Sequence, residues 1–165
     1  GLTISKGKVN KGIGGGLCQL ANLIHYMVLH SPLEVIELHH HTDALFPDSQ
    51  RRVPFGTGTS IFYKNVDYRF KNTTNHDIQL RIWQDHTNLF GELRSTEPLL
   101  FKYRLTEEDH YFAVEGKEYF RNSKIYRNIL DKSTNELINN ELILVNHSKV
   151  MYDYDLIPKD EILVK

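Results

Sequence analysis

The stretch Gly14-Gly-Gly-Leu-Cys-Gln-Leu-Ala-Asn-Leu-Ile-His-Tyr-Met-Val-Leu-His30 decides the first element of the fold. Its apolar residues recur at the spacing of one helix face, and they are Leu17, Leu20, Ala21, Ile24 and Val28. Glycines precede this pattern, and Pro32 follows it and disfavours helical backbone at Ser31. The sequence therefore predicts a helix that begins at the glycine-rich turn and ends near His30.

Downstream of this helix the apolar periodicity changes to two residues, which is typical of strands. Alternating segments follow one another with short polar turns between them, at 34–38, 59–63, 66–70, 78–83, 89–94 and 101–105. The nine Tyr and eight Phe residues favour strands as well. We expect an α+β fold in which an antiparallel, aromatic-rich β-meander packs on one main helix that starts at the cysteine-containing turn.

The character of the sequence changes near Thr106, where the strand-like segments become more charged. We divide the chain there into a first domain over 1–105 and a β-rich C-terminal extension over 106–165. Further strands are expected in the extension, at 111–114, 119–131, 136–145 and 149–155, the last as a strand or a short helix. Because the chain starts at Gly1 in sequence that already has the pattern of ordered structure, we expect the N-terminal part of a longer domain to be missing.

The composition of the 165 residues excludes several classes of protein. Lys and Arg number 20 against 21 Asp and Glu, so the basic excess expected of a nucleic-acid-binding protein is absent. No apolar run approaches the ~20 residues of a membrane-spanning helix, and no export signal is visible within these residues. Cys18 is the single cysteine, which excludes an internal disulfide and a zinc site built from a cysteine cluster.

Cys18 lies at the start of the predicted helix, next to glycines. A helix N-terminus presents unpaired N–H groups and a partial positive charge, and both favour a thiolate, which is the nucleophile of cysteine chemistry. The backbone of Gly15 and Gly16 would let a substrate carbonyl approach closely and would stabilise an oxyanion. The other interpretation is a buried structural cysteine, because free cysteine is among the most buried residue types. The residues leave both interpretations open.

The run His39-His-His41 follows the strand expected at 34–38. In an extended chain His39 and His41 share one face, and the middle histidine points the other way. A general base for Cys18, a metal site and a solvated strand end are the three interpretations. No carboxylate or second cysteine stands at a recognisable ligand spacing, so we assign no metal. His25 lies about 10 Å from Cys18 along the helix, so we expect it to pack beside the site.

The remaining candidates are carboxylates and a glycine-spaced loop. The carboxylates that would orient a catalytic histidine are Asp43, Asp48 and Asp67, and for each of them a solvated surface group is the more common explanation. The loop Pro54-Phe-Gly-Thr-Gly-Thr59 holds Gly56 and Gly58, and it either lines a substrate cleft or forms a plain tight turn.

Four segments of the chain occur in the order seen in the VanW-like domain family, which is named for a gene product of some vancomycin-resistance clusters. They are Gly14-Gly-Gly-Leu-Cys-Gln19, the His41 segment, Phe55-Gly-Thr-Gly-Thr-Ser60 and Asp67-Tyr-Arg-Phe-Lys-Asn72. The chain resembles this family from Gly1 to about Arg94, and the tail to Asp155 resembles the extension of stand-alone members. Two positions depart from the pattern: Leu38 stands where many members carry Arg, and Gly58 stands where others carry Asp.

The resemblance implies an activity, because some members of the family act as LD-transpeptidases that make 3-3 cross-links in bacterial peptidoglycan. It implies that Cys18 attacks the carbonyl that precedes a terminal D-alanine in a stem peptide, with His41 as the general base. The substrate loop would consist of Gly15, Gly16, Gln19, Gly56 and Gly58. Asp67 or Asp43 would orient the histidine, His39 and His25 would lie behind the reacting groups, and no cofactor is needed.

The alternative implied by the same resemblance is a non-catalytic accessory domain of the cell envelope. Such a domain would bind peptidoglycan fragments or a partner protein. A cell-wall substrate would place the domain outside the cytoplasm. A missing N-terminal part would also expose strand edges, through which two copies of the chain would pair.

Overall fold

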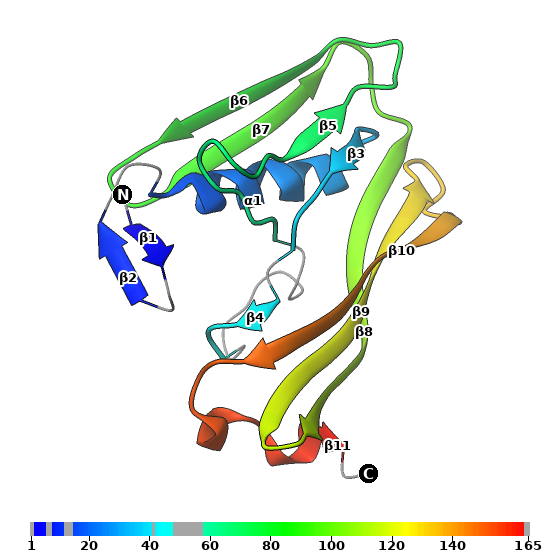
Figure 1. Ribbon diagram of the computed structural model, residues 1–165. Helices are drawn as coiled ribbons and strands as arrows, with labels where there is room; N and C mark the ends of the chain where they lie inside the picture. The colour runs from blue at the N-terminus through cyan, green and yellow to red at the C-terminus, as the bar shows by residue number, and fades with distance from the viewer. Residues whose placement is uncertain (1, 6–7, 12–14, 41, 48–57, 164–165) are drawn as a thin grey trace. The chain divides into compact units, whose positions relative to one another are not determined.

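The computed structural model describes residues 2–5, 8–11, 15–40, 42–47 and 58–163 (Figure 1). The chain forms two compact units, the first from residues 1–40 and 58–99 and the second from residues 41–57 and 100–165. The described residues hold one α-helix and eleven strands, so the α+β class is confirmed. No helix in this described part is long and apolar enough to cross a membrane.

The helix α1 (Leu17–Leu29) forms where the sequence predicts it. Gly16 precedes it with φ 88°, in the left-handed region that glycine adopts without steric cost, and its carbonyl accepts the first helical bond from Leu20 N–H. At the other end Ser31 closes the helix, because its N–H and its hydroxyl both donate to the Val28 carbonyl. Pro32 then continues the chain in a non-helical direction.

A β-hairpin packs on α1 in the first unit. Its strands are β6 (Ile78–Gln84) and β7 (Leu89–Ser95), which pair antiparallel along their whole length. Gly91 marks how closely the two elements approach, since a Cβ atom there would lie 2.6 Å from the Met27 Cε atom. The hairpin therefore lies against the helix closely enough that a side chain at position 91 would require the end of the Met27 side chain to move (Figure 1).

Two further small sheets complete the first unit. The strands β1 (Leu2–Ser5) and β2 (Lys8–Lys11) form a hairpin that the periodicity did not predict, and β3 (Glu34–Glu37) pairs antiparallel with β5 (Arg69–Lys71). The strand predicted at 59–63 is wrong. Lys64 has φ 68°, and the chain turns there so that Phe62 and Val66 form only an isolated bridge.

The second unit is built on a five-stranded sheet with the order β11-β8-β9-β10-β4. Its three long strands, β8 (Phe101–Glu115), β9 (Glu118–Asp131) and β10 (Leu137–Val150), are antiparallel neighbours. The short strands β4 (Asp43–Ala44) and β11 (Ile162–Leu163) pair parallel with β10 and β8. Two 3-10 turns, η1 (Tyr154–Leu156) and η2 (Lys159–Glu161), lead from β10 to β11.

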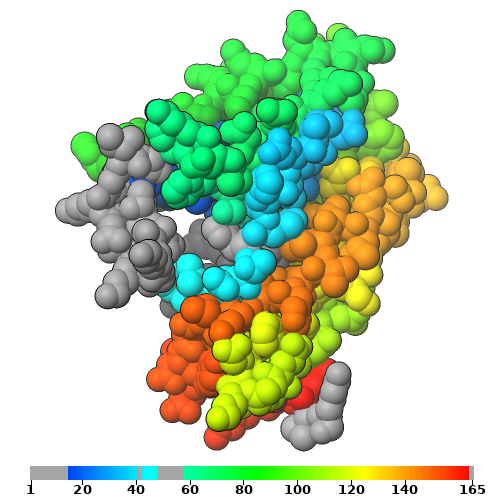
Figure 2. Space-filling model, viewed as in Figure 1, coloured from blue at the N-terminus to red at the C-terminus, as the bar shows by residue number. Residues whose placement is uncertain are grey.

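The core of the second unit lies where these turns cover one end of the sheet. Phe112, Val150 and Ile157 are buried together, with Tyr119, Tyr152 and Ile162 packed against them. The strand β10 also carries four exposed apolar side chains, Leu137, Ile138, Leu142 and Val145. The orange atoms of this part of the chain are visible on the surface in Figure 2.

The expectation of one antiparallel meander on the helix is not confirmed. The described strands belong to four separate sheets, and the largest of them is mixed, with parallel pairs at both edges. Periodicity shows that a segment is a strand but does not show which strands pair, so the partition into sheets was not available from the pattern. The domain division at Thr106 stays a prediction.

We expect the Phe112→Ala variant to lose about 3–5 kcal/mol of unfolding free energy, because the ring is 2% exposed and its removal leaves a cavity. Urea unfolding measures this loss. The matched control is Val114→Ala in the same strand, where the side chain is 49% exposed and the loss is at most about 0.5 kcal/mol. Equal losses in the two variants would contradict the assigned core.

Candidate functional site

One face of α1 carries three polar side chains at helical spacing, Cys18, Asn22 and His25. Each of them bonds to the segment of chain that returns past the helix after residue 57. The partners are the Ile61 carbonyl, the Thr59 amide and the Tyr68 hydroxyl. The helix face that bears the cysteine is therefore a polar strip that holds a second segment of chain.

Cys18 is the second residue of α1 and is partly buried. Its Sγ atom donates to the Ile61 carbonyl oxygen at 3.4 Å, a bond that a thiol makes and a thiolate does not. The first helical bond runs from Leu20 N–H to Gly16, so the N–H groups before Leu20 precede the helix ladder. Cys18 thus lies beside backbone donors of the kind that bind an oxyanion.

Asn22 holds the returning segment one helical turn further along. Its Oδ1 atom accepts a hydrogen bond of 2.7 Å from the Thr59 N–H, and Thr59 is fully buried. A Cβ atom on Gly58 would lie 3.1 Å from the same Oδ1 atom, so the amide fits closely against a glycine. We call residues 58–61 the strap.

The strap also binds the backbone that follows β3. The His39 carbonyl accepts a bond of 2.6 Å from the Ser60 N–H and one of 3.4 Å from the Thr59 hydroxyl. The strap is therefore bonded on one side to α1 and on the other to the start of the histidine run. Figure 2 shows the chain of β3 and the segment that leads from the strap to β5 lying against each other on the surface.

His25, which is buried on the same helix face, pairs with the partly buried Tyr68 of the returning segment. The His25 Nδ1 atom and the Tyr68 hydroxyl lie 3.0 Å apart, and the two rings meet edge to face. The pKa of His25 is lowered to about 4. Burial is the main cause, and the nearby charge of His40 is a smaller one. Burial also raises the pKa of Tyr68. Both side chains are therefore neutral at pH 7, and His25 packs beside the site as a hydrogen-bonding group.

The other sequence candidates are scattered. His39 is exposed and lies 3.0 Å from Glu37, while Asp67 is exposed and faces Arg69 at 3.8 Å. Asp43 belongs to β4 in the second unit. His41, Asp48 and Gly56 lie outside the described residues. No group of three or more His, Cys, Asp or Glu that could hold a metal ion occurs in the described part of the chain.

Asn22, Tyr68 and the hydrogen bonds of the strap were not predicted from the sequence. A signal was present, because Asn is unfavourable inside a helix and is spaced at four and three residues from Cys18 and His25. The partners of this strip come from a loop that lies about forty residues away in sequence, so no local pattern identifies them.

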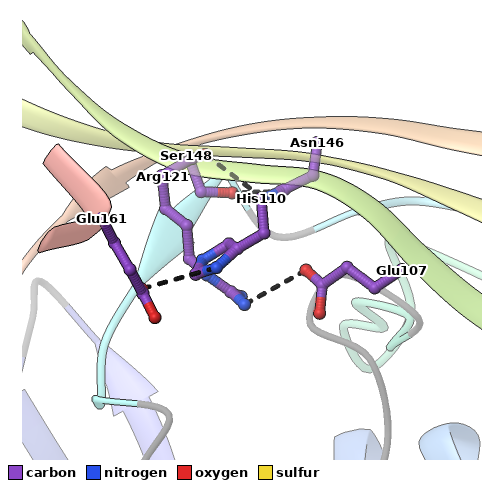
Figure 3. A network of polar contacts seen from close by, with 6 residues as sticks. All are labelled: Glu107, His110, Arg121, Asn146, Ser148 and Glu161. Atoms are coloured by element: carbon purple, nitrogen blue, oxygen red, sulfur yellow. Dashed lines mark hydrogen bonds and ion pairs between the residues drawn. The ribbon is translucent and has the colours of Figure 1, made fainter. Parts of the chain in front are cut away.

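A second polar cluster lies on the sheet of the second unit, and it is charged rather than neutral (Figure 3). Arg121 is 3% exposed, and it donates from Nε to His110 Nε2 at 2.8 Å and from Nη2 to Glu107 Oε1 at 3.1 Å. His110 Nδ1 lies 3.5 Å from Glu161 Oε2 in η2. Asn146 donates to the Arg121 carbonyl on the same face. This cluster ties the C-terminal turn to the sheet.

The family described as VanW like protein matches residues 1–94. The chain belongs to this family. It is 26% identical over 152 residues to the Vancomycin B-type resistance protein VanW of Enterococcus faecalis (strain ATCC 700802 / V583), which covers 92% of this chain. It is 30% identical over 78 residues, 47% of this chain, to the uncharacterized protein YoaR of Bacillus subtilis (strain 168).

The chain spans about half the length of the first of these relatives, 55%, and 24% of the second. No solved structure matches the chain. The family match contains the whole polar strip of α1 together with the strap and Tyr68.

We expect His25 to make the protein less stable in acid. Between its ordinary pKa of 6.5 and its folded pKa of about 4, the unfolded chain binds a proton that the folded chain does not. The free energy of unfolding therefore falls as the pH drops from about 6.5 to about 4, by about 3 kcal/mol in total. Above and below this window His25 does not make it depend on pH. Urea unfolding at several pH values measures this slope.

The His25→Gln variant should show a shallower fall of unfolding free energy with acid than the parent, because it lacks the titrating group. The control is His147→Gln, whose side chain is 49% exposed, and this variant should keep the slope of the parent. A parent and a His25→Gln variant with the same slope would contradict a buried neutral His25.

We expect Arg121→Met to lose about 3–5 kcal/mol of unfolding free energy, because it leaves the Glu107 carboxylate and the His110 ring without their buried donor. The control is Arg81→Met, which removes an exposed ion pair with Glu92 and should cost at most about 1 kcal/mol. Chemical unfolding monitored by circular dichroism compares the two, and a loss for Arg121→Met no larger than for Arg81→Met would refute the assignment.

Proposed function

We propose that the protein carries out cysteine-dependent acyl transfer on peptidoglycan stem peptides, with Cys18 as the nucleophile. Membership of the VanW-like family and similarity to a vancomycin-resistance protein support a role in the cell envelope and in antibiotic resistance. The observation that carries the finer proposal is the place of Cys18, partly buried at the first turn of α1 after Gly15 and Gly16. There the backbone N–H groups that precede the helix ladder can bind an oxyanion.

The reaction consists of two acyl transfers. Cys18 Sγ attacks the carbonyl carbon that precedes the terminal D-alanine, a thioester forms, and the C–N bond to D-alanine breaks. The thiol proton passes to the general base and then to the departing amine. The side-chain amine of a second stem peptide then attacks the thioester, an amide forms, and its proton returns through the base to Cys18.

The general base of this proposal is His41, which comes two residues after His39 in the sequence. The His39 carbonyl accepts two hydrogen bonds from Thr59 and Ser60, so the histidine run starts from a point bonded to the same strap as Cys18. Asp67 and Asp43 are the carboxylates proposed to orient His41. Gly56 and Gly58 are the glycines proposed to line the substrate.

A second candidate function is a non-catalytic accessory domain that binds peptidoglycan fragments or a partner protein. One observation favours it: the Cys18 thiol donates to the Ile61 carbonyl, as a structural cysteine does. In this alternative the polar strip only fastens the strap to α1, and the binding surface lies elsewhere on the chain.

Replacement of the nucleophile separates the two functions. We expect Cys18→Ala to abolish 3-3 cross-links in muropeptides made from cells that produce the protein, because no thioester can form without the sulfur. Purified parent protein mixed with a tetrapeptide stem should also show a thioester adduct by intact mass, and Cys18→Ala should show none.

The matched control is Gln79→Ala, on an exposed position of β6, which should keep the cross-links and the adduct. Melting temperatures of both variants show that the fold is kept. Identical cross-link patterns for the parent and for Cys18→Ala would rule out acyl transfer and would favour the accessory domain.

A further inference from the structure

We propose that the face of the β6–β7 hairpin that points away from α1 binds a muramyl peptide, the sugar-peptide unit of peptidoglycan. The rings of Trp83 and Phe90 would lie under the amino sugar, and Arg81 and Arg94 would bind the carboxylates of the peptide. The inference rests on the peptidoglycan ligand that the proposed function requires, and it does not depend on the reactivity of Cys18.

The hairpin has two faces with different surroundings. Ile82 and Gly91 lie opposite each other in the ladder, on the face that packs on α1, where a Cβ atom on Gly91 would meet Met27. Because neighbouring residues of a strand point to opposite sides, the residues next to this pair point away from the helix (Figure 1). We call that side the outer face, and it carries Arg81, Trp83, Phe90, Glu92 and Arg94.

Trp83 and Phe90 form an exposed aromatic pair on the outer face. Their rings are stacked, with the centroids 5.6 Å apart and the planes at 9° to each other. Trp83 is nevertheless 46% exposed and Phe90 37% exposed. An exposed apolar patch that polar residues border is typical of a binding site. The C–H bonds of a sugar ring carry a partial positive charge that the negative face of an aromatic ring attracts, so the pair fits a sugar.

The charges beside the aromatic pair are unbalanced. Arg81 Nη1 and Arg94 Nη2 both pair with the same oxygen of Glu92, at 2.8 Å and 3.0 Å. A guanidinium group has five N–H donors, so a shared carboxylate oxygen leaves donors of both arginines available to a ligand. In the turn of the hairpin Asp85 accepts from two backbone N–H groups, which compensate its charge locally. The outer face is therefore positive next to its rings, and it favours a ligand with carboxylates.

The order of these groups along the hairpin matches the order of groups in a muramyl peptide. The Arg81 guanidinium lies 6.0 Å from the centre of the Trp83 ring. Arg94 follows Phe90 by four residues of β7, which is about 13 Å along an extended strand. A muramyl peptide has an amino sugar at one end, and the carboxylates of its peptide follow at increasing distance from the ring.

The same charges disfavour a second copy of the chain as the occupant of this face. A symmetric contact through the outer face would bring Arg81 and Arg94 of one copy against the same residues of the other. Like charges in contact oppose association. A muramyl peptide instead offers both a ring for the aromatic pair and carboxylates for the arginines.

Trp83 is the single tryptophan of the chain, so the emission of the protein reports on this face directly. The test titrates the full chain with a disaccharide-tetrapeptide of peptidoglycan. The comparison ligands are the free tetrapeptide, which lacks the sugars, and a tetramer of N-acetylglucosamine, which lacks the carboxylates. We expect a saturable shift of the emission to shorter wavelength, with the disaccharide-tetrapeptide bound more tightly than either comparison ligand.

Variants of the outer face test the assignment by isothermal titration calorimetry. We expect Trp83→Ala to weaken binding of the disaccharide-tetrapeptide at least about ten-fold, because the stacked ring is lost. The double variant Arg81→Gln/Arg94→Gln should weaken it about three- to ten-fold and reduce its dependence on salt. The matched controls are Phe101→Ala and Arg104→Gln, which are exposed positions of the second unit and should bind as the parent does.

Several results would overturn the proposal. They are an unchanged emission of the parent up to millimolar disaccharide-tetrapeptide, equal binding of the free tetrapeptide, and parental affinity in Trp83→Ala. Self-association that Trp83→Ala abolishes, without binding of the disaccharide-tetrapeptide, would assign the face to a second copy. If circular dichroism shows that Trp83→Ala is unfolded, the double arginine variant decides, and parental affinity in it overturns the proposal. Tight binding by a parent protein that forms no thioester adduct supports the outer face and contradicts acyl transfer alone.

Discussion

The hydrogen bond from the buried Thr59 amide to Asn22 Oδ1 is the interaction on which the site in the first unit depends. A buried backbone N–H without a partner costs about 1–3 kcal/mol, so the strap lies where a partner exists. Once Thr59 is bonded, the Ile61 carbonyl lies against Cys18 and the His39 carbonyl receives its two donors. One side chain of α1 thus connects the cysteine, the strap and the histidine run.

The two units bury polar groups in different ways. In the first unit the strip of α1 is neutral, because burial keeps both His25 and Tyr68 uncharged. In the second unit Arg121 is buried with its charge, and Glu107 and His110 compensate it. The strip of α1 holds the strap through neutral hydrogen bonds, whereas the charged Arg121 cluster fastens a turn to a sheet.

Several elements were predictable because a local pattern encodes them. The helix start was predicted from glycines and its end from Ser31 and Pro32, and the structure confirms both, with Cys18 in the first turn. Strands β6 and β7 also lie where period two predicts them. The predicted strand at 59–63 failed because the turn at Lys64 and the bonds of the strap override its alternation. The hairpin β1–β2 was missed because each of its strands has only four residues, which is too short a run for a period of two to be distinctive.

The sequence by itself determined the family, the single cysteine and its place at the start of a helix, because helix signals and composition are local. The tertiary structure decided what that sulfur contacts. The partners of Cys18, Asn22 and His25 lie 43, 37 and 43 residues away along the chain. Contacts over such separations depend on which segment returns to the helix and in which register, and that is decided by packing and by the need to satisfy buried amides.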